Sequence, residues 1–315
     1  MRRIVALVLL LSSCALGPGV TAPPPTTTTS SAPQTTTTVA PAPTTTTTSA
    51  PISVCEGIGG TPRVLGVVDE PGLAEASGLV YSEADPGTLW THNDGGSPPR
   101  LWAIGGDGTV RGHVEIDARN VDWEDIALGP GPVTGWYVYL GDIGDNLAQR
   151  DRVWLHRFPE PDDLDEPVDA VESVAVRYPD GPADAEALMV DPVTGDAFIV
   201  TKAATGRSAV LRIPAGAWTS GSLEASVVAT IDLGTFALVT GGDISRDGSL
   251  IAVRTYTGIW LWARHDGESV SEALHRPPCP APAPDEDQGE SIALGSNGYA
   301  TLSEGVGTRL FRFDR

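Results

Sequence analysis

Glutamate recurs at one position of a strand pattern that the chain repeats five times. If the repeats form a ring, three glutamates meet near its axis, and carboxylates held close together resist ionisation unless a cation compensates their charge. Oxygen ligands from carboxylates, a hydroxyl and backbone carbonyls suit Ca²⁺ better than zinc, which prefers histidine and cysteine. The pattern therefore predicts Ca²⁺ on the axis. The predicted metal ligands are Ser77, Glu124, Glu186, Asp243 and Glu290.

A second set of polar residues follows the second strand of each repeat. In a propeller blade the first strand starts, and the second strand ends, on the same face, so this set and the glutamates should share one surface. We expect these residues to contact a small-molecule or cell-wall ligand. They are Asn93, Asp145, Asn146, Tyr256 and Glu304.

Four further residues of the same surface have the chemistry for phosphoryl transfer. Lys202 and Arg254 would offer positive charge to phosphoryl oxygens, and Asp94 or Asp142 would act as general base. Two plainer interpretations stay open. The cations could form ordinary ion pairs with acidic neighbours, and the glutamates could bind only channel waters and backbone amides.

The ring of strand starts at Ser77, Glu124, Glu186, position 242 and Glu290 resembles the axial calcium ring of soluble calcium-activated nucleotidases, which are five-bladed propellers. Position 242 is glycine where that family has serine, so its carbonyl or Asp243 would have to substitute. The chain is also similar to bacterial phytase-like propellers, another calcium-dependent group. The resemblance covers the strand starts and not the loops. It implies hydrolysis of phosphate esters or anhydrides, with calcium polarising the phosphate or lowering the pKa of a bound water.

A non-catalytic function is the alternative. No motif specifies base, cation and nucleophile together, and propellers serve both as enzymes and as binding modules. The alternative is a calcium-stiffened ring that binds a cell-wall component or a protein partner.

The strands that would position these residues recur at intervals of roughly 50 residues, the length of one propeller blade. Each repeat continues with a second and a third strand, and four repeats continue with a fourth, expected at 110–116, 173–177, 226–231 and 270–274. The segment Arg63–Val68 would supply the missing strand of the last blade and close the ring. We therefore predict an all-β, five-bladed β-propeller. A β-sandwich is the rival, but its repeats are usually shorter.

The charge of the chain restricts its partners. Acidic residues outnumber basic residues 41 to 20, for a net charge of −21. A field of that sign repels phosphate backbones and anionic membrane surfaces, so nucleic-acid binding is excluded. We expect a monomer.

The N-terminal part predicts export and anchoring. Two arginines and a short apolar run form a signal peptide over residues 1–13, and Leu11–Cys14 resembles the lipobox of bacterial lipoproteins. An ordinary signal with an incidental cysteine is the alternative. Residues 14–54 would be a lipidated Cys14 followed by a Thr- and Pro-rich tether, holding the propeller of residues 55–315 at the outer face of the cell membrane. In that compartment Cys55 and Cys279 are expected to form a disulfide.

Overall fold

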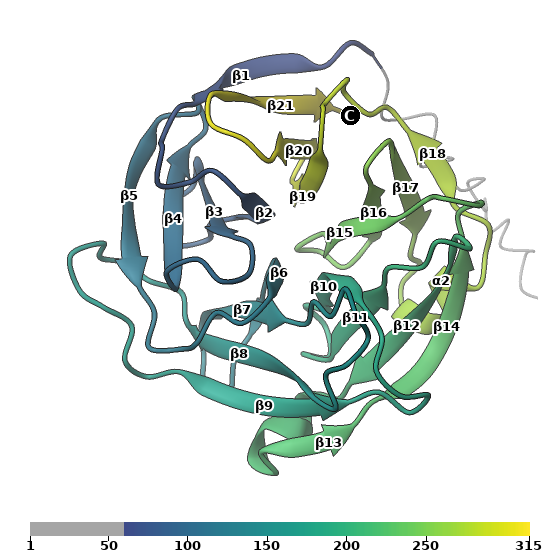
Figure 1. The fold of residues 1–315 in the computed structure, drawn as a ribbon. Coiled ribbons are helices and arrows are strands. Elements are labelled where there is room, and N and C mark those ends of the chain that lie inside the picture. The colour runs from purple at the N-terminus through teal and green to yellow at the C-terminus, as the bar shows by residue number, and fades with distance from the viewer. Residues whose placement is uncertain (1–59) are drawn as a thin grey trace, which may run out of the picture. The chain divides into compact units, whose positions relative to one another are not determined.

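The computed structural model describes residues 60–315, which form five antiparallel sheets around a central axis. Figure 1 shows the sheets arranged as the blades of a propeller, with the innermost strands nearest the centre. The predicted all-β, five-bladed fold is therefore confirmed. The predicted signal peptide, Cys14 and the tether lie outside the described residues, as does Cys55. Within residues 60–315, no helix has the length and apolar character needed to cross a membrane.

Each blade begins with an innermost strand near the axis and continues outward. Blade 1 contains β2 (Ala76–Tyr81), β3 (Thr88–Asn93), β4 (Arg100–Gly105) and β5 (Val110–Glu115), and blade 2 contains β6 (Trp123–Pro130), β7 (Trp136–Asp142), β8 (Val153–Pro159) and β9 (Glu172–Arg177). Blade 3 contains β10 (Ala185–Val190), β11 (Ala197–Thr201), β12 (Arg207–Ile213) and β14 (Ser226–Asp232), and blade 4 contains β15 (Val239–Ile244), β16 (Leu250–Thr255), β17 (Gly258–Ala263) and β18 (Cys279–Ala281). Blade 5 contains β19 (Gly289–Gly295), β20 (Gly298–Ser303), β21 (Thr308–Asp314) and β1 (Arg63–Val68).

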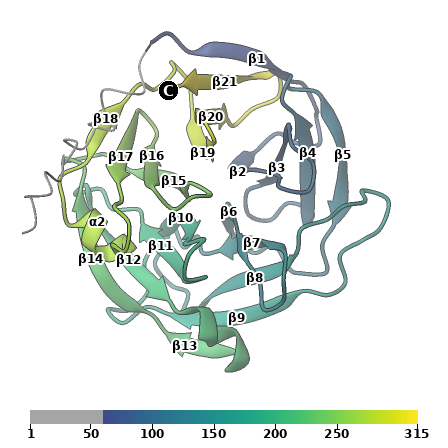
Figure 2. The ribbon, with the colours of Figure 1, turned by 180° about the vertical axis from the view of Figure 1, so that it is seen from behind.

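The ring closes as predicted. Strand β1 pairs with β21 in antiparallel register, with Val64 opposite Phe311 and Val68 opposite Thr308. Figures 1 and 2 show the two strands side by side from opposite directions. The outermost strand of blade 5 thus comes from the other end of the domain, and radial closure leaves no long inner sheet edge exposed.

Two local predictions differ from the structure. Val270–Leu274 is a helix, α2, and not the fourth strand of blade 4. Ser269 and Glu272 form a capping box that starts this helix, and the short strand β18 takes the outer position instead. Blade 2 has an additional outer strand, β13 (Ser222–Glu224), which follows the 3₁₀ helix η1 (Ala215–Thr219) and pairs in parallel with β9.

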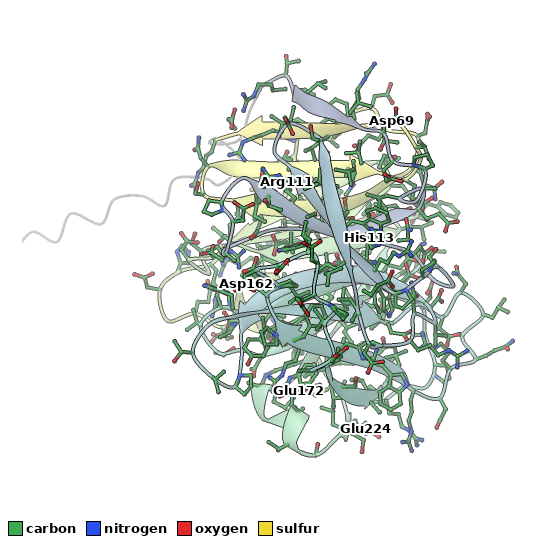
Figure 3. The ribbon with its side chains drawn as sticks, turned by 90° about the vertical axis from the view of Figure 1, so that its left-hand side faces the viewer. Asp69, Arg111, His113, Asp162, Glu172 and Glu224 are labelled. Atoms are coloured by element: carbon green, nitrogen blue, oxygen red, sulfur yellow. The ribbon has the colours of Figure 1, made fainter. Side chains whose placement is uncertain are left out.

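The outer strands present a charged surface. Figure 3 views the ring from the side of blades 1 and 2, where Arg111 and His113 of β5 and Glu172 of β9 are labelled. Apolar side chains fill the space between neighbouring sheets, as in the cluster of Val80, Trp90 and Ile126 between blades 1 and 2. The blades therefore pack face to face around the axis, and the two inner strands of each blade are mostly buried.

Every inner strand has a register shift near its start, where it pairs with the second strand. In three blades the extra residue is a glutamate: Glu124, Glu186 or Glu290. A β-bulge leaves one residue outside the ladder and redirects its side chain. The same irregularity in blade 4 falls at Thr240, between Val239 and Gly241. In ladder register, Thr240 therefore corresponds to the three glutamates, and Gly242 lies two residues further along β15.

Candidate functional site

The mouth of the propeller, where the inner strands begin, gathers carboxylates. Two groups of three lie close enough to share a cation, with their oxygen atoms within 4.8 Å of one another. The groups have Glu124 in common. The first consists of Asp94, Asp122 and Glu124, and the second of Glu124, Asp184 and Glu186.

Backbone passes unusually close to these carboxylates. A Cβ added to Gly144 would lie 2.0 Å from Glu124 Oε1 and 2.6 Å from Asp122 Oδ2, and a Cβ on Gly95 would lie 2.3 Å from Asp122 Oδ1. Side chains at these two positions would occupy the space that the carboxylates use. The two glycines therefore allow the loops after β3 and β7 to enclose Asp122 and Glu124 without filling the mouth.

The electrostatics of the mouth favour bound positive charge. Burial, together with the charges of Glu186 and Asp94, raises the pKa of Glu124 well above its usual range. Burial and the neighbouring Asp94 raise the pKa of Asp122 to about 6, and burial also raises the pKa of Asp94. Without a cation, these carboxyl groups retain protons at pH values where isolated ones are ionised. A cation would compete with those protons.

Lys202 is one of the cations that the chain itself supplies to the mouth, beside Arg150, which donates to the Gly144 carbonyl at 2.7 Å. The Lys202 Nζ lies 2.5 Å from Glu186 Oε1 and donates to the hydroxyl of Tyr256 at 2.9 Å. The ammonium also lies 5.0 Å from the centre of the Tyr256 ring. Burial raises the pKa of Glu186, with the lysine opposing that rise. One lysine thus offsets one carboxylate of the cluster, as the ion-pair interpretation expects.

Glu290 and Glu304 extend the acidic surface into blade 5. Glu290 is buried at the bulge of β19, and burial, together with Glu186 and Glu304, raises its pKa to about 8. Glu304 accepts a hydrogen bond from the Gln288 amide at 2.6 Å. Both side chains interact electrostatically with groups of the mouth, including Lys202.

Arg254 does not present its charge to the mouth. Its side chain is 2% exposed and pairs with Glu286, and its Nη1 donates to the carbonyl of Ser291 at 2.9 Å. Gly289 leaves room for it, because an added Cβ there would lie 2.0 Å from Arg254 Nη2. Arg254 therefore connects β16 to the start of β19, which differs from the predicted phosphoryl-binding position.

Several predicted site residues instead shape the loops of the mouth. Asp142 is buried and accepts from Arg150 Nη2 at 2.7 Å, so a paired carboxylate stands where a general base was predicted. Asp145 accepts from the backbone N–H of Gln149 at 2.8 Å, and its own N–H donates to Asp184 Oδ1 at 2.8 Å. Asn146 is exposed on the same loop.

The Asn93 amide likewise binds backbone. It donates to the Gly72 carbonyl at 2.8 Å and accepts from the Glu75 N–H at 3.1 Å. Asn93 thereby fixes the segment that leads into β2. It supports the rim of the mouth and has no free amide group directed to a ligand.

Hydroxyl and aspartate groups of the inner strands connect neighbouring blades. The Ser77 hydroxyl donates to the Glu124 carbonyl at 2.6 Å, and Thr240 donates equivalently to the Gly289 carbonyl at 2.9 Å. Asp243, which was predicted to ligate the metal, is fully buried and accepts from the N–H groups of Ile244 and Leu294 at 2.8 and 2.7 Å. Asp243 is thus engaged between blades 4 and 5 below the mouth.

Asp125 has a similar but larger role in blade 2. One oxygen accepts from the Ile126 N–H at 2.8 Å, and the other accepts from the N–H groups of Leu188 at 2.8 Å and Gly242 at 3.0 Å. A single carboxyl group therefore joins the inner strands of three blades.

Asp122 and Asp184 were absent from the predicted site, although a sequence signal marks them. Each precedes a bulged glutamate by two residues, in Asp122-Trp123-Glu124 and Asp184-Ala185-Glu186. Both aspartates lie just before an inner strand, next to its bulge. The repeated Asp-x-Glu pattern could therefore have identified both carboxylates.

The donor set of the mouth fits a hard cation. Asp94, Asp122, Glu124, Asp184 and Glu186 offer only carboxylate oxygens, which suit Ca²⁺ or Mg²⁺ and not the nitrogen- and sulfur-preferring metals. Ca²⁺ accepts six to eight oxygen ligands at about 2.3–2.6 Å, whereas Mg²⁺ usually keeps its waters and takes one or two carboxylates. Each group brings three carboxylates together, a donor set that could hold a hard divalent cation of either kind.

Comparisons with known proteins do not identify a family. No family model matches the chain, and no curated protein matches it. Among solved structures, the chain is similar to one titled "Crystal structure of Nidogen/Laminin Complex", with 12% sequence identity, a TM-score of 0.40 and coverage of 73% of each chain. The fold assignment therefore rests on the five sheets themselves.

Proposed function

We propose that this protein is a calcium-binding β-propeller whose mouth uses bound Ca²⁺ and Lys202 to bind an anionic small-molecule or cell-wall ligand. The observation that supports this function is the pair of overlapping carboxylate groups joined by Glu124. Two groups that share a ligand concentrate negative charge, and burial together with that charge raises the pKa values of Glu124 and Asp122.

The arrangement also favours a ligand that reaches the metal. Asp94 and Asp122 are only half-buried, whereas Glu124 and Glu186 lie deeper. A cation held from below keeps coordination positions toward solvent, where an anionic group can replace water. Lys202, 14% exposed at its side chain, would then contact the same anion from the side of blade 3.

A calcium titration tests the proposal directly. Isothermal titration of chelator-treated protein with CaCl₂ should show saturable binding, and calcium should raise the melting temperature by mass action. MgCl₂ serves as the matched ion and should bind more weakly. A melting temperature indifferent to calcium and to chelator would refute the site.

Hydrolysis of phosphate esters or anhydrides is the second candidate, in line with the resemblance to calcium-dependent nucleotidases and phytase-like propellers. It is supported by Asp94, whose raised pKa brings it nearer to that of an effective general base. Lys202 would stabilise charge on the phosphoryl oxygens. Turnover of 4-nitrophenyl phosphate or pyrophosphate that requires calcium and is lost in Asp94→Asn would distinguish an enzyme from a binding module.

We further propose export and anchoring at the outer face of the membrane through lipidated Cys14, and a disulfide between Cys55 and Cys279. Cys14→Ser should move the protein from the membrane to the soluble fraction. Mass spectrometry of a non-reduced digest should find the two peptides linked.

A further inference from the structure

The end of the ring opposite to the mouth contains a cavity of about 570 Å³. It lies where the inner strands of blades 1, 4 and 5 finish, because its lining includes Tyr81 at the end of β2, Ser245 just after β15 and Leu294 near the end of β19. Its volume is within the range of sites that bind small organic molecules. None of the carboxylates of the mouth lines it.

Arginine defines the chemistry of this cavity. Arg246 follows β15 of blade 4 and reaches blade 1, where its Nε lies 2.9 Å from Glu83 Oε1 and its Nη2 donates to the Tyr81 carbonyl. Its guanidinium lies 4.6 Å from the centre of the Trp136 ring of blade 2. Arg312 of β21 donates to the Tyr81 hydroxyl at 2.7 Å. Arg312 also pairs with Asp314 Oδ1 at 2.7 Å, and Arg315 is a third arginine of the lining. In a chain with net charge −21, a cavity with three arginines and two acids is locally suited to an anion.

One donor of Arg246 has no partner. Its Nη1 is inaccessible to water and makes no hydrogen bond within residues 60–315. That N–H has no surface open to solvent and so does not face the cavity; a ligand would instead contact the exposed 24% of the Arg246 side chain. The two acids of the lining already have partners, since Glu83 pairs with Arg246 and Asp247 accepts from the Ser245 and Ser249 hydroxyls.

Four side chains form the apolar part of the lining, beside several serines and glycines. Leu250 and Leu294 are buried beside the cavity, and Tyr81 and Pro86 line it from blade 1. A purely inorganic ion would leave these surfaces without contacts, whereas a ligand with an apolar body would cover them. A single carboxylate also suits the charge better than a doubly charged phosphate, because Glu83 and Asp247 offset much of the arginine charge.

We propose that this cavity is a second ligand site, for a small organic acid that places a carboxylate near Arg246 and an apolar or aromatic body against Leu250, Leu294 and Tyr81. The site is independent of calcium. It uses a different end of the ring and different strand termini, and it would hold an anion directly with arginine and not through a bound metal ion.

Isothermal titration with benzoate tests the proposal, with benzyl alcohol as the neutral analogue and phenyl phosphate as the dianion. Benzoate should bind with and without chelator, and benzyl alcohol about tenfold more weakly or worse, since the charge-assisted hydrogen bond is lost. Binding of the alcohol as tight as that of benzoate, or tighter binding of phenyl phosphate, would overturn the carboxylate assignment.

Two variants locate the site. Arg246→Gln should weaken benzoate binding about tenfold or more, whereas Arg207→Gln, which changes an exposed arginine of blade 3, should not. Because Arg246 also connects blades, Ser296→Trp provides a second test: it fills the cavity from an exposed turn and should abolish binding. Unchanged benzoate affinity in folded Ser296→Trp protein would refute the site.

Discussion

The same five inner strands begin at the mouth and end at the cavity, yet the two ends carry opposite chemistry. At the mouth, bulges place the buried Glu124 and Glu186 beside further acids. At the other end, the chain leaving β15 leads directly to Arg246, which stacks on Trp136. The residues that flank each inner strand therefore determine which ligands each end can bind, because the strand interiors serve only to hold the blades together.

Asp125 lies between the two ends, and its removal should have the largest effect on both. Asp125→Ala leaves three backbone N–H groups of Ile126, Leu188 and Gly242 without their acceptor, so we expect a loss of about 3 kcal/mol or more in unfolding free energy. Chemical denaturation measures this loss. Asp125→Asn keeps one carbonyl acceptor and should lose less; equal stability of all three proteins would contradict the inter-blade role.

Glu124→Gln should weaken ligand binding at the mouth without affecting the cavity at the opposite end. Because Glu124 belongs to both carboxylate groups, its amide variant should reduce calcium affinity by about a hundredfold, in keeping with the loss of a charged ligand from a hard-cation site. Benzoate binding at the opposite cavity should not change. Glu115→Gln, on the outer strand of blade 1, is the matched control. A hundredfold effect at both ends would show that they are not independent.

The pH dependence of stability gives a smaller, signed test. Burial raises the folded-state pKa of Glu290 from 4.5 to about 8, so between these values the folded protein binds more protons than the unfolded chain. The contribution of Glu290 to the unfolding free energy should therefore be complete below pH 4.5 and should be lost as the pH rises toward 8. Melting curves in chelator measure the fall, and calcium should reduce it. Glu290→Gln should flatten the curve, whereas a rise in stability over the same window would contradict the assignment.

Gly144→Ala should have the smallest effect and is confined to the mouth. The new methyl group would meet Glu124 Oε1, which must move aside. We expect calcium affinity to fall about fivefold, because a flexible carboxylate can partly recover its position. Gly135→Ala is the control. Its added Cβ meets nothing within 4 Å, but its φ of +128° makes alanine strain the backbone, so this variant shows the effect of strain without a steric clash. Calcium titration of the two variants should separate a steric from a backbone effect.

The global fold was predictable because repetition makes each blade evidence for the next. Five strand starts of similar spacing, and one unpaired strand at Arg63–Val68, specify both the blade count and the closure. The error at Val270–Leu274 was avoidable, since Ser269 and Glu272 form the Ser-x-x-Glu capping pattern of a helix start. The capping pattern predicts a helix at this position, whereas the repeat of the other blades predicts a strand.

The site was only partly predictable, for two physical reasons. A bulge adds one residue to a strand without changing its hydrophobic pattern, so the equivalence of Thr240 with Glu124 could not be derived from spacing. The burial of Arg254 depends on Glu286, which lies in the connection between two blades. Asp122 and Asp184, in contrast, follow a visible Asp-x-Glu pattern.

Ring closure by β1 and β21 has a consequence for how the protein is made. Arg63 lies opposite Arg312 in that ladder, so ribosomes must synthesise the four complete blades and most of the fifth before β1 has a partner. Until then the nascent chain exposes an unpaired strand edge, which is prone to pair with other chains. A stop codon before Thr308 would leave this edge uncovered permanently. Such truncated chains are expected to aggregate or to be degraded, and are not expected to accumulate as four-bladed rings.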